Sequence, residues 1–493
     1  MSQQHNPAIE APDPRRWLSL AILLLALFMN LIDVTIVNVA LPSMRDNLGA
    51  SDTQIEWVVA AYVLAFALGL LPFGRLGDIV GRTRMFLLGV TGFTLASALC
   101  GLSGSIEMLI FARVLQGIGG AMMTPQVLAI ATVTFPPHER GKAFSLFGLA
   151  SGLAAVCGPI LGGLLIDAHL FGLDWQPIFL VNIPVGLVAL IAGWKLIPSL
   201  PGHPGLRNDY VGILLFGAGI VSIVFAIVEG QPLGWPLWIF ALMAAGAILL
   251  AAFVWWQRRR AEAGLSQLLN YDLMRNRDYV FGAFVMTVYA SGIPGMFMVI
   301  SLLLQAGFDF TPLQSGLTNT PFSIGVLVAS LIAGRFAHNF LRSRLAAAGG
   351  MLAVGILWLH FVIASSTETI IPSSFLVPLL IAGIGLGTGF SALFQLVLRN
   401  VPPRDAGAGS GALQAFQQIG GALGVALVGQ IFFAQLGTNM AAGAERHIAF
   451  AGAAALALWY QVAAFALVMG LAFFFRAPNP SSETRATAPA LEV

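Results

Sequence analysis

Long runs of apolar residues recur along the whole chain and leave few ways for it to fold. Each run is about 20 residues long, the length that an α-helix needs to cross the hydrocarbon core of a bilayer. Apolar residues make up 58% of the chain and charged residues only 9%, whereas a soluble domain carries about 25% charged residues. The sequence therefore predicts an integral membrane protein.

About fourteen runs are long enough to be predicted as membrane-spanning helices. Only helices satisfy every backbone group within one segment in lipid, and these runs are too long and too uniformly apolar for the strands of a barrel. We therefore predict an all-α membrane protein. Its spans are predicted at 17–41, 55–73, 84–103, 106–134, 141–166, 178–197, 210–229, 235–256, 279–304, 312–337, 344–364, 373–398, 407–437 and 449–475.

The basic residues predict which helix ends lie in the cytoplasm. With the N-terminus inside, about 21 of the 24 Lys and Arg residues fall at cytoplasmic ends or loops, as the positive-inside rule expects. The exceptions are Arg45, Arg113 and Arg446. An odd number of spans would remove this bias from the second half of the chain. We therefore expect an even number of spans, with both termini in the cytoplasm.

Other classes of protein find little support in the sequence. A net charge of +2 gives no reason to expect a nucleic-acid partner. Cys100 and Cys157 lie in apolar runs and do not form a disulfide framework. We find no nucleophile–base constellation, no His/Cys metal cluster and no phosphate-cradling loop. We expect a protein that is not an enzyme, needs no cofactor or metal, and draws its energy from an ion gradient.

A short loop motif occurs twice and indicates an internal repeat. GRLGDIVGRTR (74–84) joins the second and third spans, and GRFAHNFLRSR (334–344) joins the tenth and eleventh. The offset of eight spans is explained by two six-helix halves with two helices inserted between them, a common transporter plan. The predicted parts are a cytoplasmic tail (1–16), an N-terminal bundle (17–197), the inserted helices with their linkers (198–278), a C-terminal bundle (279–476) and a second cytoplasmic tail (477–493).

The first copy of the loop has the residues of a conformational clamp. Glycines permit tight turns and close backbone approach, and Asp78 can cap a helix or pair with a nearby arginine. A cluster of this kind could hold one conformation and release in another. The alternative is a solvated basic loop that only satisfies topology. The candidate gating residues are Gly74, Asp78, Gly81, Arg82 and Arg84.

The loop at 74–84 resembles the signature loop of the major facilitator superfamily, and the fourteen spans resemble its drug:proton antiporter branch. Four further segments are similar to motifs of that branch: LIDVTIVNVALP (31–42), LIFARVLQGIGGA (109–121), CGPILGG (157–163) and GSGALQAFQQIGGALGVAL (409–427). The third resembles the antiporter motif of the fifth helix, carried here by Gly158, Pro159, Gly162 and Gly163.

The chain departs from the family pattern in three places. His338 stands in the second loop where Asp78 stands in the first, so only the first copy can form the acidic clamp. Ala154 replaces the usual first glycine of the antiporter motif, and DWQPIF (174–179) lacks the Arg and second Trp common in the family. None of these changes removes a charge expected within the membrane.

Two charged residues lie inside predicted spans at similar depths. Asp33 is about 12 Å and Arg113 about 10 Å from the outer ends of their helices, at 1.5 Å per residue. A lone charge near mid-membrane is costly, so such residues face a cavity or a partner. We expect both to face a shared central cavity, paired directly or through water. Asn30 shares the face of Asp33, and Gln116 shares the face of Arg113.

This placement suggests that Asp33 takes up and releases a proton as its distance from Arg113 changes. A cationic substrate could compete for the same carboxylate. The alternative is a static ion pair that fixes helix packing. His360 is expected to be structural, while Glu56 and Glu229 sit near outer helix ends and are expected to be solvated.

The resemblance implies a proton-coupled antiporter that exports amphipathic drugs or toxic compounds by alternating access in the plasma (bacterial inner) membrane. Its expected partners are amphipathic small molecules, protons and membrane lipids. A periplasmic adaptor is not favoured, because the outer loop at 438–448 is short. The alternatives are a dedicated exporter of one metabolite, antibiotic or lipid, and a proton-coupled importer.

Overall fold

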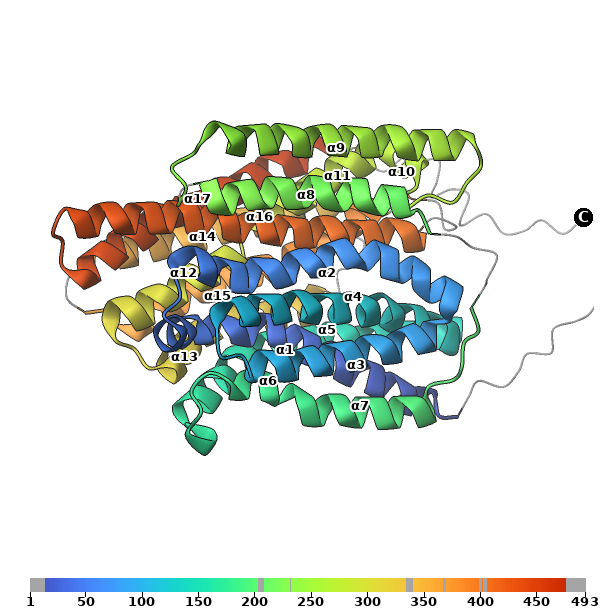
Figure 1. The fold of residues 1–493 in the computed structure, drawn as a ribbon, viewed down its shortest axis with the longest axis horizontal. Helices are drawn as coiled ribbons and strands as arrows, with labels where there is room; N and C mark the ends of the chain where they lie inside the picture. Colours follow the sequence, from blue (N-terminus) through green and yellow to red (C-terminus); the bar gives the residue numbers. More distant parts are fainter. Residues whose placement is uncertain are drawn as a thin grey trace, which may run out of the picture.

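A computed structural model describes residues 14–202, 208–230, 232–333, 340–366, 369–398, 401 and 406–475. The predicted C-terminal tail and nearly all of the N-terminal tail lie outside these residues, as does most of the second loop motif, including His338. The described chain is helical throughout, and its long helices run roughly parallel (Figure 1). The predicted all-α multi-pass architecture is confirmed.

Twelve helices of the described residues are long and apolar enough to cross a membrane. Two more long helices, α5 and α13, have 31 and 22 residues. A total of fourteen spans stays a prediction. The first half of the chain contains α1 (Arg16–Leu48), α2 (Asp52–Val80), α3 (Arg82–Gly101), α4 (Ile106–Thr134), α5 (Pro137–Asp167), η1 (Leu170–Gly172), α6 (Pro177–Leu180), α7 (Asn182–Leu196), α8 (Tyr210–Gly230) and α9 (Leu237–Glu262).

The second half begins with α10, a single short turn, and continues through seven longer helices. They are interrupted by brief π and 3₁₀ turns, which extend α12, α15 and α17. The bounds are α10 (Tyr271–Arg275), α11 (Arg277–Ser291), α12 (Pro294–Leu302), η2 (Leu303–Gly307), α13 (Pro312–Ala333), α14 (Leu341–Ala364), η4 (Pro372–Phe375), α15 (Leu376–Leu398), α16 (Ala406–Ala441), α17 (Arg446–Leu471) and η6 (Ala472–Phe474).

The turn between α1 and α2 shows how local sequence sets the helix ends. Gly49 adopts a left-handed conformation (φ 61°) and ends α1, as glycine does readily because it has no Cβ. Two residues later Ser51 and Gln54 form a capping box that starts α2. The helix α1 extends to Leu48, seven residues beyond its predicted end. The polar segment after Pro42 continues the helix outside the apolar run until Gly49 ends it.

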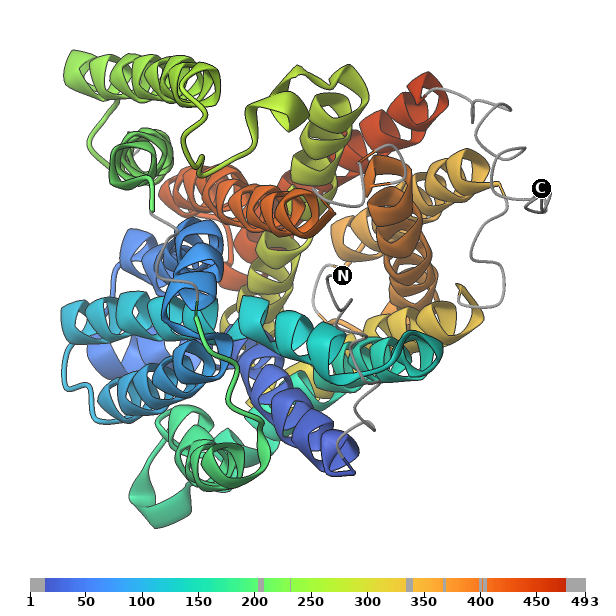
Figure 2. The same cartoon turned by 90° about the vertical axis from the view of Figure 1, so that its right-hand side faces the viewer.

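Two sets of helices pack against each other. We call α1–α7 the N-terminal set and α11–α17 the C-terminal set. Within the first, α4 packs on α2 and α3, and α5 packs on α1; within the second, α15 packs on α13 and α14. The sets meet where α2 packs on α16 and α5 packs on α13 (Figure 2). We call the face where α1 begins and η6 ends the near face, on the right in Figure 1, and the opposite one the far face.

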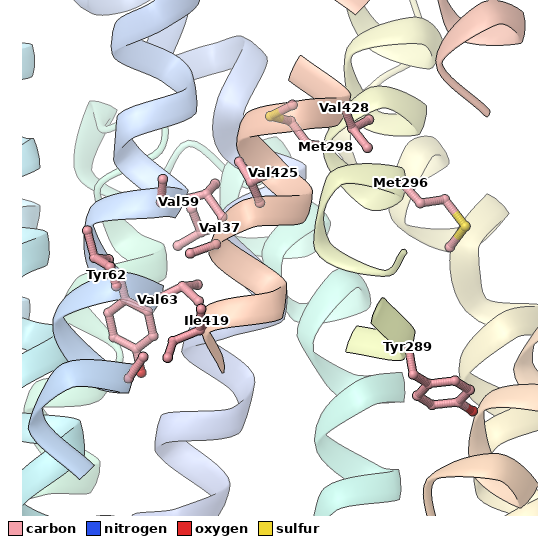
Figure 3. Packing of buried hydrophobic residues seen from close by; sticks show 14 of the residues in the cluster. Val37, Val59, Tyr62, Val63, Tyr289, Met296, Met298, Ile419, Val425 and Val428 are labelled. Carbon is pink, nitrogen blue, oxygen red and sulfur yellow. The ribbon is translucent and has the colours of Figure 1, made fainter. Parts of the chain in front are cut away.

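An apolar seam joins the two sets between α2 and α16. Val59 and Val63 of α2 face Ile419 and Val425 of α16, with Val37 of α1 beside them (Figure 3). All five side chains are buried. Close packing of this kind contributes to helix association in lipid.

The helices α8 and α9 form a hairpin along the outside of the two sets (Figures 1 and 2). The buried Asp209, just before α8, accepts hydrogen bonds from Trp256 Nε1 at 2.8 Å and from Gln257 Nε2 at 2.7 Å, both on α9. Gln257 Oε1 in turn accepts from the Leu268 backbone N–H at 3.1 Å. This buried network fixes the hairpin at its near-face end, because an unpaired polar group there would be costly.

Candidate functional site

Asp33 of α1 and Arg113 of α4 form a buried ion pair. Arg113 Nη1 lies 2.6 Å from Asp33 Oδ2, and the two side chains are 0% and 1% exposed. Direct pairing was one of the two arrangements expected from their similar depths. The pair is neutral as a unit, which lowers the cost of burying each charge.

Each member of the pair has further polar partners. Asp33 Oδ1 accepts from Gln116 Nε2 at 2.7 Å and from Asn182 Nδ2 at 3.2 Å. Arg113 donates from Nε to the Val58 carbonyl at 3.1 Å and from Nη1 to Gln116 Oε1 at 2.6 Å. Two amide donors and the Arg113 countercharge therefore hold the carboxylate, as a buried charge requires.

An aromatic ring lies against the guanidinium on its other side. The Arg113 guanidinium carbon lies 4.1 Å from the centre of the Tyr62 ring on α2, a cation–π contact. The Tyr62 hydroxyl accepts from Asn30 Nδ2 at 2.7 Å. Asn30 therefore supports the site through Tyr62.

The shared central cavity expected around the pair stays a prediction, and in this conformation both side chains are enclosed. Every side chain that contacts the pair belongs to the N-terminal set, and the group is closed by Ser97 of α3, which accepts from Gln116 Nε2 at 2.9 Å. In this conformation the ion pair lies inside the N-terminal set, screened from both faces.

Sequence reasoning missed three members of this site. Asn182 is the only strongly polar residue in the apolar run at 178–197 apart from the terminal Lys195, and this isolation was a usable signal. Ser97 and Tyr62 are common types in membrane helices, so only the packing of α2 and α3 on α4 reveals their contacts.

The glycines of the antiporter motif lie where α5 contacts α1 of its own set and α13 of the C-terminal set. A Cβ on Gly162 would lie 2.9 Å from the Ile36 side chain of α1. A Cβ on Gly163 would clash with the backbone of Leu313 on α13, and one on Gly316 of α13 would clash with the Pro159 carbonyl. Small residues on α5 and α13 therefore permit the backbone contact between the sets. Gly158 has a similar close contact with Thr35 of α1.

The predicted gating loop is mostly helical, because residues 74–80 form the end of α2 and residues 82–84 begin α3. It lies against α4 at the near face. Arg82 Nε pairs with Asp78 Oδ1 at 3.0 Å, and Arg82 Nη1 donates to the Ala129 carbonyl at 3.2 Å. Gly81 has φ 110° and lies against Leu200, so it both breaks the helix and permits close approach. Arg84 is exposed.

A cavity of about 510 Å³ separates this loop from the C-terminal set. Gly74, Asp78 and Arg82 line one side, and Ser410 and Gln414 of α16 line the other. The loop therefore faces α16 across an open space at the near face, and its Asp78–Arg82 pair lies wholly within the N-terminal set.

Two of the lesser sequence expectations have opposite outcomes. His360 Nδ1 lies 2.8 Å from the Ala455 carbonyl and its ring packs on Trp459, which fits a structural histidine. The expected solvation of Glu56 is wrong. Glu56 is only 2% exposed, because α16 packs against it at Gly429.

Comparisons with known proteins agree with the fold. The sequence matches the family model of the Major Facilitator Superfamily over residues 23–210 and 203–425. It is 40% identical to a protein named probable actinorhodin transporter from Streptomyces coelicolor, over 88% of this chain and 75% of that one. It is 36% identical to the puromycin resistance protein of Streptomyces alboniger, over 89% of this chain and 87% of that one.

The structure is also similar to that of a bacterial homologue of the human lysosomal transporter Spinster in an inward-facing, occupied conformation. The TM-score is 0.62, the sequence identity is 18%, and the match covers 95% of this chain and 100% of that one. At this identity the likeness concerns the fold alone.

Proposed function

Because the chain belongs to the Major Facilitator Superfamily, we propose that it is a proton-coupled antiporter that exports amphipathic drugs or toxic compounds. The family and the fold are those of a transporter rather than an enzyme. Relatives named as a transporter of actinorhodin and as a puromycin resistance protein support export of such compounds. The observation that carries the coupling is the enclosed ion pair of Asp33 and Arg113.

The ion pair couples protonation to helix position for an electrostatic reason. Adding a proton to Asp33 would leave the Arg113 charge buried without its counterion, which costs several kcal/mol. The proton can therefore bind only if α1 moves relative to α4, or if water or a substrate reaches the arginine. A proton entering from one side and leaving to the other would thus accompany a change of conformation.

Alternating access supplies that change of conformation. The basic residues assign the near face to the cytoplasm, with both termini inside. The far ends of the two sets touch, since Gln305 Nε2 of η2 donates to the Val39 carbonyl of α1 at 2.8 Å, while a cavity lies between them at the near face. The bundles 17–197 and 279–476 would rock against each other, so that the near face closes as the far face opens.

The gating loop and the antiporter motif have distinct parts in this cycle. Closing the near-face cavity would bring Ser410 and Gln414 of α16 toward Asp78 and Arg82, so the loop would clamp the outward-open state. The close contact of α5 with α13 would open at the same time. Protons and amphipathic small molecules are the only partners this cycle needs, and it involves no cofactor.

Proton flux in liposomes tests the proposal. The purified protein would be reconstituted with a pH-sensitive dye inside, given a proton gradient, and supplied with lipophilic cations and neutral drugs. We expect several unrelated compounds to trigger proton flux, and Asp33→Asn to abolish it. Asp174→Asn, on an exposed far-face loop, is the matched control and should behave as the native protein.

Two results would change the conclusion. Substrate-triggered proton flux that persists in Asp33→Asn would make the ion pair a static packing element and remove the coupling claim. Flux with one class of compound only would favour a dedicated exporter of one metabolite, antibiotic or lipid.

A further inference from the structure

Glu56 is a buried carboxyl group that the proposed cycle does not use. It lies in the second turn of α2 at the far face, and the residue is 2% exposed. Within the described part of the chain its Oε2 atom has no hydrogen-bond partner. A carboxylate anion buried in this way, with neither donor nor countercharge, costs several kcal/mol, and the neutral acid costs far less.

The carboxyl group rests on the helix of the opposite set. A Cβ on Gly429 of α16 would lie 2.5 Å from Glu56 Oε1 and 2.8 Å from Oε2, so the carboxyl group rests directly on the glycine. Glu56 therefore fills the far end of the contact between α2 and α16. Separation of the two helices would expose this group to the solution at the far face.

The inserted helix α8 closes the third side. Trp57 Nε1 of α2 donates to Glu229 Oε1 of α8 at 2.8 Å, and Gln430 Nε2 of α16 donates to the Val228 carbonyl of α8 at 3.0 Å. The end of α8 thus bonds to both helices that enclose Glu56.

The ionisable groups facing Glu56 are acidic. They are Asp52 on α2 and Glu229 on α8, and α16 presents only Gly429 and the neutral Gln430 there. The nearby arginine of α1, Arg45, lies 2.8 Å from Asp52 and is occupied by it. The negative charges of these two carboxylates oppose ionisation of Glu56. No positively charged group among the described residues offsets that repulsion.

We propose that Glu56 is a second proton-binding group, and that its protonation latches α2 against α16 at the far face. The proposal rests on the alternating access of the proposed function. When the far face opens, the carboxyl meets water and releases its proton there; when a proton from that side binds again, the neutral acid can be buried on Gly429. Glu56 takes up and releases its proton on the same side, so it moves no net proton across the membrane. Its protonation instead depends on the pH at the far face.

Hydrogen exchange of the native protein in lipid nanodiscs tests the latch without any substrate. Exchange at residues 52–63 and 425–436 would be followed at about pH 5 and about pH 9, between which buried glutamates ionise. The rates would be corrected for the intrinsic pH dependence of amide exchange. We expect protection at both segments at low pH. Protection should fall by up to about tenfold for each pH unit over which Glu56 ionises.

Matched variants assign the effect to Glu56. Glu56→Gln mimics the neutral acid and should stay protected at both pH values. Glu229→Gln removes a neighbouring like charge and keeps Glu56, so it should retain a pH-dependent loss of protection that begins at lower pH. Glu56→Leu also cannot ionise and should likewise lose the pH dependence, which keeps the test decisive if Glu56→Gln folds poorly.

The outcomes separate this proposal from the function on which it rests. Equal protection of the native protein at both pH values, or native pH dependence in Glu56→Gln, would overturn the latch. Asp33→Asn should lose proton flux and retain the pH-dependent protection of α2 and α16. Failure of Asp33 as the coupling residue would leave that protection pattern unaffected.

Discussion

The indole Nε1 of Trp57 lies 2.8 Å from Glu229 Oε1 and donates a hydrogen bond to it. This bond joins the start of α2 to the end of α8, one residue away from the buried Glu56. A helix of the inserted hairpin is thereby tied to the contact between the two sets. When α2 and α16 separate, α8 must move with one of them or release the other, so the inserted pair belongs to the moving parts.

The Trp57–Glu229 bond should contribute measurably to stability. Trp57→Phe keeps the aromatic packing but removes the donor, leaving a partly buried carboxylate without its partner. We expect the free energy of unfolding in detergent micelles to fall by about 1–3 kcal/mol. Glu229→Gln keeps an acceptor for the indole and should lose less. If denaturant titrations give Trp57→Phe the same free energy of unfolding as the native protein, the bond does not contribute to stability.

The Asp33–Arg113 pair should behave as one energetic unit. Arg113→Met leaves a buried carboxylate without its counterion and should cost about 3–5 kcal/mol of unfolding free energy. Adding Asp33→Asn removes the orphaned charge, so the double variant should be more stable than Arg113→Met alone. Denaturant unfolding of the four proteins gives the coupling. Strict additivity would mean that the two side chains do not interact.

The contact of α5 with α13 should tolerate no side chain at Gly163. Gly163→Ala places a methyl group against the backbone of Leu313 and should drive the two helices apart, with faster hydrogen exchange at the start of α13. Gly470→Ala is the matched control, because nothing lies within 4 Å of its Cβ position. Identical exchange at α13 in the two variants would argue against the close contact.

The Asp78–Arg82 pair should matter for transport and little for stability. Its side chains are about one-third exposed, and exposed pairs contribute about 0–1 kcal/mol. We expect Asp78→Asn to unfold like the native protein and to transport poorly. The pair of Arg258 with Glu262 has the same helical spacing on α9, so Glu262→Gln should leave both unchanged. Full transport by Asp78→Asn would remove the clamp from the mechanism.

Much of the fold could be predicted because its determinants are local. A run of 20 apolar residues requires a helix wherever it lies in a membrane, so the element type follows without knowledge of neighbours. The pairing of Asp33 with Arg113 was also accessible, since two opposite charges at similar depth have few other ways to be neutralised. The superfamily resemblance of the loop at 74–84 and of the four motifs agrees with the family match.

The rest depends on which helices cover which residues. Glu56 looks solvated in the sequence because it lies close to a helix end, and it is buried only because α16 and α8 pack over that end. The enclosure of Asp33 follows from Ser97 and Asn182 on helices distant in sequence. Periodicity gives the face on which a residue lies but not the partner of that face.

The apolar seam between α2 and α16 gives the molecule a thermal property. The side chains of Val37, Val59, Val63, Ile419 and Val425 contain only hydrocarbon, so where water enters the parted seam the heat capacity rises. The gain from keeping such surface dry weakens on cooling. The closed far face should therefore lose population in the cold, and the resting conformation of this transporter would depend on the temperature at which it is observed.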